Sequence, residues 1–358
     1  MELHPDSNRS SAKPPEWARI LKSLIEGRSL DFDVAYSAMS EMLSGETPAP
    51  VTAGFLVALR TKGESVEEMA GLASAMIDFS TPVPYHGDLV DTCGTGGDQK
   101  HSVNFSTMAA LVVAAAGSKV CKHGNRAASS MSGSADVLEH LGVKIDLGAQ
   151  EVLACIDETN IGFCLAPRFH SAMRHVIPIR RALAVPTAFN FLGPLVNPAR
   201  ANRQLVGVFE PKMARTIAEV LARLGSEHAL VAYSADGFDE LSTTSVNTVI
   251  ELHRSASDSV HFEEYKLDPR DFGFSLSDPR DLLGGDPARN GDVLRSILGG
   301  ADGPVRDVVL FNAGAALYVA GRTSDIAAGI ALAREILDAG LALDTLSQLI
   351  EVSNRNVA

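Results

Sequence analysis

The 358-residue sequence has few aromatic residues, few cysteines and no long hydrophobic run. It contains one tryptophan and four cysteines, and aromatic residues make up 6% of the chain. Cys93, Cys121, Cys155 and Cys164 do not follow a metal-binding or redox spacing, which favours reduced thiols in a cytoplasmic protein. The longest apolar runs, such as residues 109–116, are too short to span a bilayer, so we expect no membrane segment.

The sequence also lacks a basic excess. Its formal net charge of -13 argues against a general nucleic-acid-binding protein, which needs a positively charged face. This charge does not exclude a local site for an anion. The polar residues 1–14 are expected to form a disordered tail, and they do not have the apolar segment of a signal peptide.

Residues 15–82 predict a helical domain, because apolar residues recur at helical spacing and no strand-like alternation occurs. Four short helices are expected, over residues 17–25, 32–43, 51–59 and 66–77. A glycine lies shortly after each of the first three, where helices commonly end. Ser65 and Glu68 have the spacing of a capping box at the start of the fourth.

After residue 82 short apolar strands alternate with helices, which is typical of a parallel α/β sheet. Strands are expected over residues 88–91, 119–122, 143–147, 204–209 and 228–233. Helices are expected over residues 107–116, 134–141, 150–159, a segment ending at 224, 306–319, 323–339 and 343–353. The predicted fold is therefore α/β, with a small N-terminal helical domain and a larger α/β domain that has a mainly parallel central sheet. Residues 83–177 and 203–358 are assigned to the larger domain, and the proline-containing residues 178–202 are expected to pack on the helical domain.

The segment DTCGTGGDQKHSVNFST, residues 91–107, follows the first expected strand and leads into a helix. Glycines let backbone N–H groups approach an anion, and a helix N-terminus adds free donors. The segment does not match the P-loop, which needs Lys followed by Ser or Thr after its glycines, and its three glycines lack the spacing of the dinucleotide fingerprint. By itself it fits either an anion site or a tight turn between a strand and a helix.

Two further polar clusters follow expected strands. KHGNRAASSMSGSAD, residues 122–136, combines cationic side chains with hydroxyls and an amide. DGFDELSTT, residues 236–244, contains Asp239 and Glu240, hard oxygen ligands of the kind that Mg²⁺ takes together with substrate phosphates. Each cluster alone also fits a solvated loop. Because parallel strands end at the same edge of a sheet, we expect these clusters to converge with the glycine turn.

A fourth cluster, residues 168–199, contains several basic side chains and ends in FNFLGPLVNPA. An arginine fork is the natural partner of a planar carboxylate. The glycine and prolines of the final motif cannot continue a helix, so this motif predicts a hinge or an ordered loop. We expect most residues of this cluster to have a structural role.

Together these motifs resemble the anthranilate phosphoribosyltransferase family, of the glycosyltransferase family 3 type. GTGGD, NFST, KHGNRAASS with SGSAD, HxxMRH, FNFLGPLVNPA and DGFDELS occur in the family's order, from about Trp17 to the final helices. The resemblance implies a fold of the nucleoside phosphorylase/phosphoribosyltransferase type and a homodimer formed through the helical domain. It also implies transfer of the phosphoribosyl group of 5-phosphoribosyl 1-diphosphate (PRPP) to the amine of anthranilate in tryptophan biosynthesis, with two Mg²⁺ ions beside the diphosphate.

The resemblance assigns residues to each ligand by motif. For PRPP it implies Gly94, Gly97, Asp98, Ser102, Asn104, Phe105, Ser106, Thr107, Lys122, His123, Gly124, Asn125, Arg126, Ala127, Ala128, Ser129, Ser130 and Ser134. For anthranilate it implies Gly94, Asn125, His170 and Arg180, with Arg180 facing the carboxylate. For Mg²⁺ it implies Ser106, Asp239 and Glu240. Lys122 would stabilise the transition state, and no covalent nucleophile is expected. His123 or His170 would be either a proton acceptor or a neutral hydrogen-bonding group.

The sequence departs from the family's commonest form at residues 99–101 and at Met131, where many relatives have lysine. Three rival functions stay open at this point, and one of them is a generic phosphate-binding metabolic protein of unknown reaction. A pyrimidine nucleoside phosphorylase-like enzyme would not need the Asp239–Glu240 pair. A non-catalytic nucleic-acid-binding relative would need a basic surface, against the net charge of -13.

Overall fold

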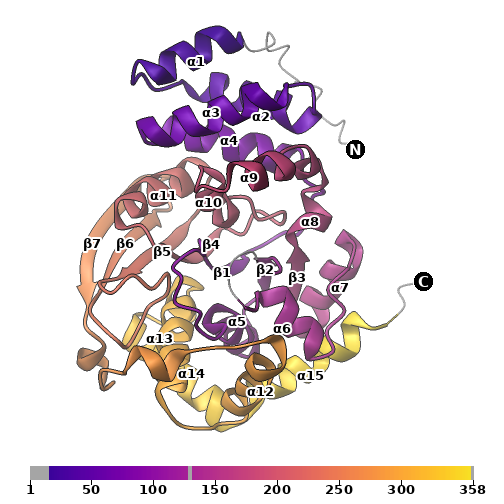
Figure 1. Cartoon of the computed structure of the whole chain (residues 1–358). Coiled ribbons are helices and arrows are strands. Elements are labelled where there is room, and N and C mark those ends of the chain that lie inside the picture. Colours follow the sequence, from indigo (N-terminus) through magenta and orange to yellow (C-terminus); the bar gives the residue numbers. More distant parts are fainter. Residues whose placement is uncertain (1–15, 128–130, 356–358) are drawn as a thin grey trace.

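The computed structural model describes residues 16–127 and 131–355. A block of four helices lies against a larger domain built on a seven-stranded sheet (Figure 1). Five of the strands are parallel, so the predicted fold class is confirmed. In the described part of the chain, none of the helices has both the length and the apolar character needed to cross a membrane.

The helical block has the four helices that the sequence predicts. They are α1 (Trp17–Ile25), α2 (Phe32–Ser44), α3 (Ala49–Lys62) and α4 (Val66–Asp78). The capping box is present, because the Ser65 hydroxyl accepts a hydrogen bond from the Glu68 N–H and the Glu68 carboxylate accepts one from the Ser65 N–H. Gly45 ends α2 in the left-handed conformation, with φ of 84°, which glycine adopts without strain.

The sheet has the strand order β3-β2-β1-β4-β5-β6-β7. The strands are β1 (Val90–Gly94), β2 (Val120–Gly124), β3 (Ile161–Leu165), β4 (Arg203–Gly207), β5 (His228–Ser234), β6 (Asn247–Arg254) and β7 (Val260–Leu267). β6 runs antiparallel to both of its neighbours. Four expected strands are present as β1, β2, β4 and β5, whereas β3, β6 and β7 were not predicted.

The strand predicted over residues 143–147 is wrong. Val143, Ile145 and Leu147 are buried, which explains the alternating pattern, but the segment pairs with no strand of the sheet. The N–H of Lys144 instead donates to the hydroxyl of Ser353 near the C-terminus. The alternation of apolar and polar residues that predicted a strand therefore belongs to an irregular segment that packs on the core.

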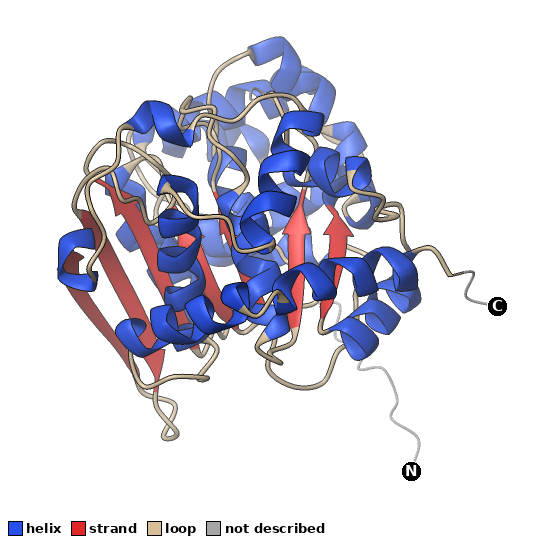
Figure 2. Cartoon of the chain, turned by 90° about the horizontal axis from the view of Figure 1, so that it is seen from below, coloured by secondary structure: helices blue, strands red, loops and turns tan. Residues whose placement is uncertain are grey.

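Helices cover both faces of the sheet (Figure 2). Outside the connector between β3 and β4, the helices of this domain are α5 (Phe105–Ala115), α6 (Ser134–His140), α7 (Ala149–Thr159), α11 (Pro211–Arg223), α12 (Pro287–Leu298), α13 (Pro304–Val319), α14 (Ile326–Asp338) and α15 (Leu341–Ser353). On one face, α5 and α13 pack in a core that includes Leu111 and Phe311. On the other face, a second core joins α11 to the helical block.

A connector between β3 and β4 belongs to this second core. It contains the short helices α8 (Ala166–Phe169), α9 (Ile177–Leu183) and α10 (Phe189–Leu192), with 3-10 turns η1 (Ser171–His175) and η2 (Gly193–Leu195). Phe191 of α10 is fully buried in the same cluster as Phe55 of α3. The connector therefore lies between the helical block and the sheet (Figure 1).

Candidate active site

The order of the strands places a crevice between β1 and β4. From β1 the chain proceeds to β2 and β3 on one side, and β4 and β5 lie on the other side. Connections leave such neighbouring strands in opposite directions, and ligands bind outside the carboxyl ends of the strands at this position. The glycine turn follows β1, the KHGN turn begins at the end of β2, and the Asp239–Glu240 segment follows β5. The predicted clusters therefore leave the carboxyl ends of neighbouring strands.

Two glycines allow the Asp239 segment to lie directly against the strand ends. A Cβ atom on Gly94 would collide with the Asp239 carboxylate, and one on Gly207 would collide with the Asp239 backbone carbonyl. The N–H of Gly96 donates to Asp239 Oδ2 at 2.6 Å. Gly94 is therefore required for close packing of a carboxylate, in addition to any contact with a ligand.

Three carboxylates, those of Asp98, Asp239 and Glu240, lie within electrostatic range of one another. Burial raises the pKa of Asp239 well above its ordinary value, and the negative charges of Asp98 and Glu240 raise it further. Burial raises the pKa of Glu240 to about 7, against the opposing effects of the Lys122 ammonium and of hydrogen bonds from Ser106. A divalent cation would relieve this repulsion.

The donor set fits Mg²⁺ bound together with a substrate. Among the described residues, no group of three His, Cys, Asp or Glu side chains is arranged to enclose a metal ion. Mg²⁺ usually takes one or two carboxylates and completes its shell with waters and substrate phosphates. Asp239, Glu240 and the Ser106 hydroxyl supply hard oxygen ligands of this kind, and Ser106 already contacts Glu240.

Lys122 is buried next to this acidic group and is not exposed to solvent. Its side chain comes from β2, and the residue is only 2% exposed. Its ammonium donates to the Thr92 carbonyl oxygen at 2.5 Å and to Ser106 Oγ at 3.2 Å. Asp91, which is fully buried on β1, is a second charged neighbour. Lys122 is thus held between the strand β1 and the start of α5, next to a predicted Mg²⁺ ligand.

The turn after β2 is organised by Asp136 of α6. Its carboxylate accepts hydrogen bonds from the N–H groups of Ala127 and Gly133, both of which belong to the turn. The Arg126 guanidinium forms ion pairs with Asp136 and with Glu139. Arg126, predicted to meet PRPP, is therefore already paired with two acidic side chains. Three other predicted PRPP contacts, Ala128, Ser129 and Ser130, lie outside the described residues.

The predicted residues around the start of α5 face different surroundings. The side chains of Phe105 and Thr107 are buried in the core, whereas Ser106 points toward Glu240. Gly97 has φ of 85° and lies against the ring of Phe209. Ser134 Oγ lies 3.5 Å from the carbonyl of Asn125, and a Cβ on Gly124 would collide with that hydroxyl.

Asn104 connects the glycine turn with the turn after β2. It also contacts residues 283–290, a segment that the sequence analysis did not predict to be part of the site. Its Nδ2 donates to the Ser132 carbonyl at 3.3 Å, and its Oδ1 accepts from Asn290 Nδ2 at 3.0 Å. Ser102 pairs with Leu283 in an isolated β-bridge. Residues 283–290 therefore support the glycine turn. The glycine pair before Asp286, which caps α12, was the available sequence signal for an ordered turn at this position.

The imidazoles of His123 and His170 lie together, with ring centroids 5.1 Å apart. His123 Nδ1 is 3.2 Å from the Gly193 carbonyl oxygen, a contact that places the proton on Nδ1. Burial, and secondarily His170, lowers the pKa of His123 to about 3. Burial also lowers the pKa of His170. Both rings are therefore neutral at pH 7, and the Nε2 atom of each is buried with no partner among the described residues.

Arg180 is a partly buried cation without an acidic partner in the described part of the chain. Its guanidinium lies over the Phe189 ring, 5.0 Å from the centroid, and burial lowers its pKa. Phe189 begins α10, which leads directly to Gly193 and its contact with His123. This position leaves the fork of Arg180 available for a planar carboxylate.

The residues that depart from the family pattern have defined contacts. The Lys100 ammonium lies 5.1 Å from the centroid of Phe238, and the Lys100 N–H donates to Asp98 Oδ1. Gln99 and His101 have φ of 57° and 52°, in the left-handed region that disfavours side chains. Met131 is 63% exposed. Lys100 therefore stabilises the turn around Asp98 and packs on the Asp239 segment.

Comparison with known proteins places these features in a family. The helical bundle domain of the glycosyl transferase family matches residues 18–80, and the a/b domain of that family matches residues 86–343. An anthranilate phosphoribosyltransferase from Laribacter hongkongensis is 48% identical over 341 residues, which cover 94% of this chain and 98% of that protein.

Solved structures resemble the whole chain. The anthranilate phosphoribosyltransferase of Thermus thermophilus has a TM-score of 0.87 at 41% identity, covering 94% of this chain and 99% of that one. The anthranilate phosphoribosyltransferase of Saccharomyces cerevisiae in complex with PRPP and Mg has a TM-score of 0.84 at 28% identity, covering 94% and 97%.

Proposed function

The chain belongs to the glycosyl transferase family whose helical bundle and a/b domains it matches, and from this premise we propose its reaction and its site. It transfers the phosphoribosyl group of PRPP to the amine of anthranilate, giving N-(5-phosphoribosyl)anthranilate and diphosphate. This is the second step from chorismate in tryptophan biosynthesis. The observation that supports this most directly is the acidic group Asp98, Asp239 and Glu240 at the strand-order crevice.

Asp239, Glu240 and Ser106 would hold Mg²⁺, with a second ion shared with the diphosphate. Bound Mg²⁺ would neutralise the diphosphate as a leaving group. The acidic group explains why Asp98 lies in a glycine turn beside a phosphate substrate, since ribose hydroxyls and metal-bound waters are good partners for a carboxylate. The turns that contain Gly94, Gly97 and Asn125 would enclose PRPP.

The reaction needs positioning and electrostatic stabilisation more than acid–base machinery. The amine of anthranilate attacks C1 of the ribose while the bond from C1 to the diphosphate oxygen breaks. Lys122 would stabilise the negative charge that develops on the diphosphate. Arg180 would orient anthranilate through its carboxylate, and the neutral imidazoles of His123 and His170 offer Nε2 acceptors to an amine N–H.

The experiment uses the fluorescence of anthranilate. The full chain with PRPP and Mg²⁺ should deplete the anthranilate signal, and EDTA should stop the depletion. Unchanged fluorescence with folded protein would contradict the proposal. A parallel assay with phosphate and thymidine tests the phosphorylase-like alternative. Arg180→Ala should raise the KM for anthranilate by about 10- to 100-fold while the KM for PRPP changes little; equal losses would show that Arg180 does not face the acceptor.

We also propose a homodimer formed through the helical block. Ile25, Val34 and Val57 from three of its helices are exposed large apolar side chains, 77%, 37% and 41% accessible. A second copy of the chain would cover such a surface. Sedimentation should give twice the chain mass, and Ile25→Asp with Val57→Asp should give the monomer.

A further inference from the structure

The GPLVN segment, residues 193–197, comes from the one conspicuous sequence motif to which the proposed function gives no role. It follows α10 and crosses the region beside strands β1, β2 and β4. The Gly193 carbonyl oxygen is 3.2 Å from His123 Nδ1, and the Pro194 carbonyl oxygen accepts a hydrogen bond from Gln204 Nε2 at 2.8 Å. The segment therefore contacts side chains of β2 and β4 through its backbone.

Asn197 adds the contact with β1. Its Nδ2 donates to Asp91 Oδ2 at 2.7 Å and to the Cys121 carbonyl oxygen at 2.8 Å, and its Oδ1 accepts from the Ala199 N–H at 2.9 Å. Asn197 is 4% exposed, so these hydrogen bonds are shielded from water. A buried amide with both ends satisfied holds its neighbours in one arrangement.

Asp91 transmits this contact to the active site. Its carboxylate is fully buried, its other oxygen accepts from the His123 N–H at 3.3 Å, and its charge interacts with the Lys122 ammonium. Without Asn197, the fully buried Asp91 Oδ2 would lose its side-chain donor. A buried carboxylate that loses a donor shifts to find another, and Lys122 is the cation with which the Asp91 charge already interacts.

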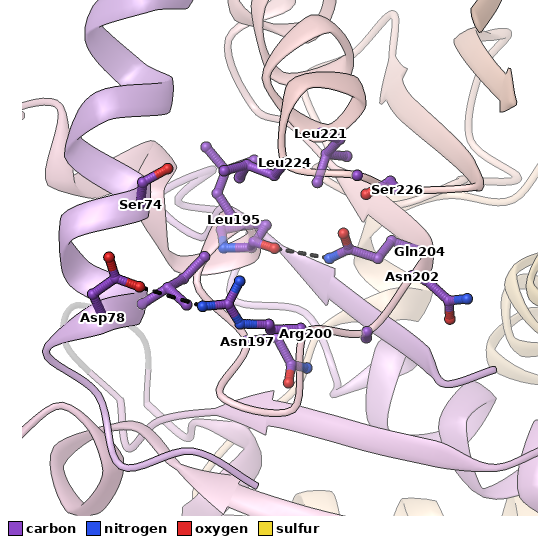
Figure 3. Close-up of a pocket in the computed structure, with 14 residues that line it drawn as sticks. Ser74, Asp78, Leu195, Asn197, Arg200, Asn202, Gln204, Leu221, Leu224 and Ser226 are labelled. Atoms are coloured by element: carbon purple, nitrogen blue, oxygen red, sulfur yellow. Dashed lines mark hydrogen bonds and ion pairs between the residues drawn. The ribbon is translucent and has the colours of Figure 1, made fainter. Parts of the chain in front are cut away.

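One side of the segment borders a cavity. Pro194, Leu195 and Asn197 line a cavity of about 250 Å³ that lies between α4 and the C-terminal end of α11 (Figure 3). Across this cavity, Arg200 forms an ion pair of 3.3 Å with Asp78 of α4. Leu195 and Val196 are nevertheless buried in the second core, so apolar packing and the hydrogen bonds to β1, β2 and β4 together hold the segment in place.

We infer that the GPLVN segment is a clamp that positions Lys122 and His123, and that Asn197 is its principal positioning residue. Asn197 acts on Lys122 through Asp91, and the Gly193 carbonyl fixes the tautomer and orientation of the His123 ring. The inference rests on the proposed function, because it treats these two residues as parts of the PRPP and anthranilate sites.

The test compares Asn197→Leu with Leu195→Ala in the full chain. Asn197→Leu keeps the side-chain size and removes the donors, whereas Leu195→Ala removes apolar contacts of the same segment and leaves its hydrogen bonds in place. We expect kcat to fall about 10- to 100-fold in Asn197→Leu, with a smaller change in the KM for anthranilate. Leu195→Ala should lower the midpoint of thermal unfolding and keep kcat within about two-fold. A folded Asn197→Leu protein with kcat within two-fold of wild type, or equal losses in both variants, would overturn the clamp.

Two further measurements keep the inference separate from its premise. Calorimetric titration of PRPP with Mg²⁺, without anthranilate, should show PRPP binding weakened by Asn197→Leu but not by Leu195→Ala, whatever the acceptor. Wild-type protein that binds PRPP but does not consume anthranilate would refute the proposed function and leave this comparison valid. If Asn197→Leu does not fold, Gln204→Met removes a different clamp contact and should lower kcat about 3- to 10-fold; unchanged kcat would overturn the clamp.

Discussion

Glu240 and Glu251 are partly buried glutamates of the same domain, yet their pKa values shift in opposite directions. Glu251 lies on β6, and its carboxylate accepts hydrogen bonds of 2.8 Å from Tyr265 and Tyr318 and contacts His228 Nε2 at 2.8 Å. Burial raises the pKa of Glu251, but these three partners outweigh that effect and lower it. Glu240 has Ser106 and Lys122 near it but also two other carboxylates, and its pKa is raised to about 7.

This difference separates an acid that supports the fold, Glu251, from one that we predict to be functional, Glu240. The Glu251 network supplies enough donors for its negative charge and ties together β5, β6, β7 and α13. The group around Glu240 contains more negative charge than its neighbours balance, so it is stable as a fully ionised group only with an added cation. A strongly raised acid pKa in a crevice is a physical reason to place a function there.

The largest expected effect is on activity, from Glu240→Gln. This change removes a predicted Mg²⁺ ligand and should lower kcat/KM at least about 100-fold, because stabilisation of the leaving diphosphate is lost. Thermal unfolding in EDTA should be unchanged or shifted upward, because the substitution relieves repulsion with Asp98 and Asp239. The fluorescence assay over a range of Mg²⁺ concentrations measures the first effect. Activity close to that of wild type would remove Glu240 from the metal site.

Glu251→Gln should have the opposite effects, a loss of stability with kcat unchanged. Removing one partner of a buried charged network should lower the free energy of unfolding by about 3 kcal/mol. The folded fraction should keep its kcat, since Glu251 lies outside the predicted site. Denaturant unfolding measures the loss, and Tyr318→Phe is the matched control, with an expected loss of about 1 kcal/mol. A loss of kcat without a loss of stability would show that the two acids do not differ in role.

The same comparison predicts opposite pH dependences of stability. In metal-free protein, Glu240 holds a proton between about pH 4.5, its ordinary value, and about 7, whereas the unfolded chain releases it. This contribution makes stability fall as pH rises through that window. The contribution of Glu251 is present above pH 4.5 and is lost as pH falls through its lowered folded pKa.

Thermal unfolding of wild type and Glu240→Gln in EDTA, measured from pH 4 to 8, tests this dependence. The decline between about pH 4.5 and 7 should be shallower in the variant, by an amount on the order of a few degrees, because Asp239 still has a raised pKa and still contributes to it. Identical slopes for the two proteins would contradict the raised pKa of Glu240.

Local patterns in the sequence predicted much of the fold. Helix periodicity and the Ser65–Glu68 capping box predicted the helical block, and turns after apolar strands predicted which clusters converge. Contacts between distant residues could not be predicted in this way. Asn197 and Asp91 are 106 residues apart, and nothing local to either shows that they meet. Likewise, the pairing of Arg126 with Asp136 and Glu139 depends on how the turn folds back on α6.

The edge strand β7 was missed for a different reason. Side chains of β7 such as those of His261, Glu263 and Glu264 are exposed, because this strand lies at the edge of the sheet. A half-exposed antiparallel strand with several charges lacks the continuous apolar run that marks a buried strand such as β5. Sequence patterns therefore revealed the parallel centre, where the site lies, more readily than the antiparallel edge that holds the Glu251 network.

The smallest expected effect concerns backbone strain in the glycine turn of the candidate active site. Gln99 has φ of 57°, which costs a non-glycine residue about 1 kcal/mol, so Gln99→Gly should raise the free energy of unfolding by up to that amount. Asp258, between β6 and β7, has φ of 65° and provides a matched position far along the sheet, where only an exposed ion pair with Arg254 is lost. Gln99→Gly should also raise the KM for PRPP by about two- to five-fold, because the turn before Ser102 gains backbone freedom, whereas Asp258→Gly should leave it unchanged. Denaturant unfolding and the fluorescence assay measure both variants. If Gln99→Gly stabilises the protein without changing the KM for PRPP, the strained turn has no part in holding the substrate.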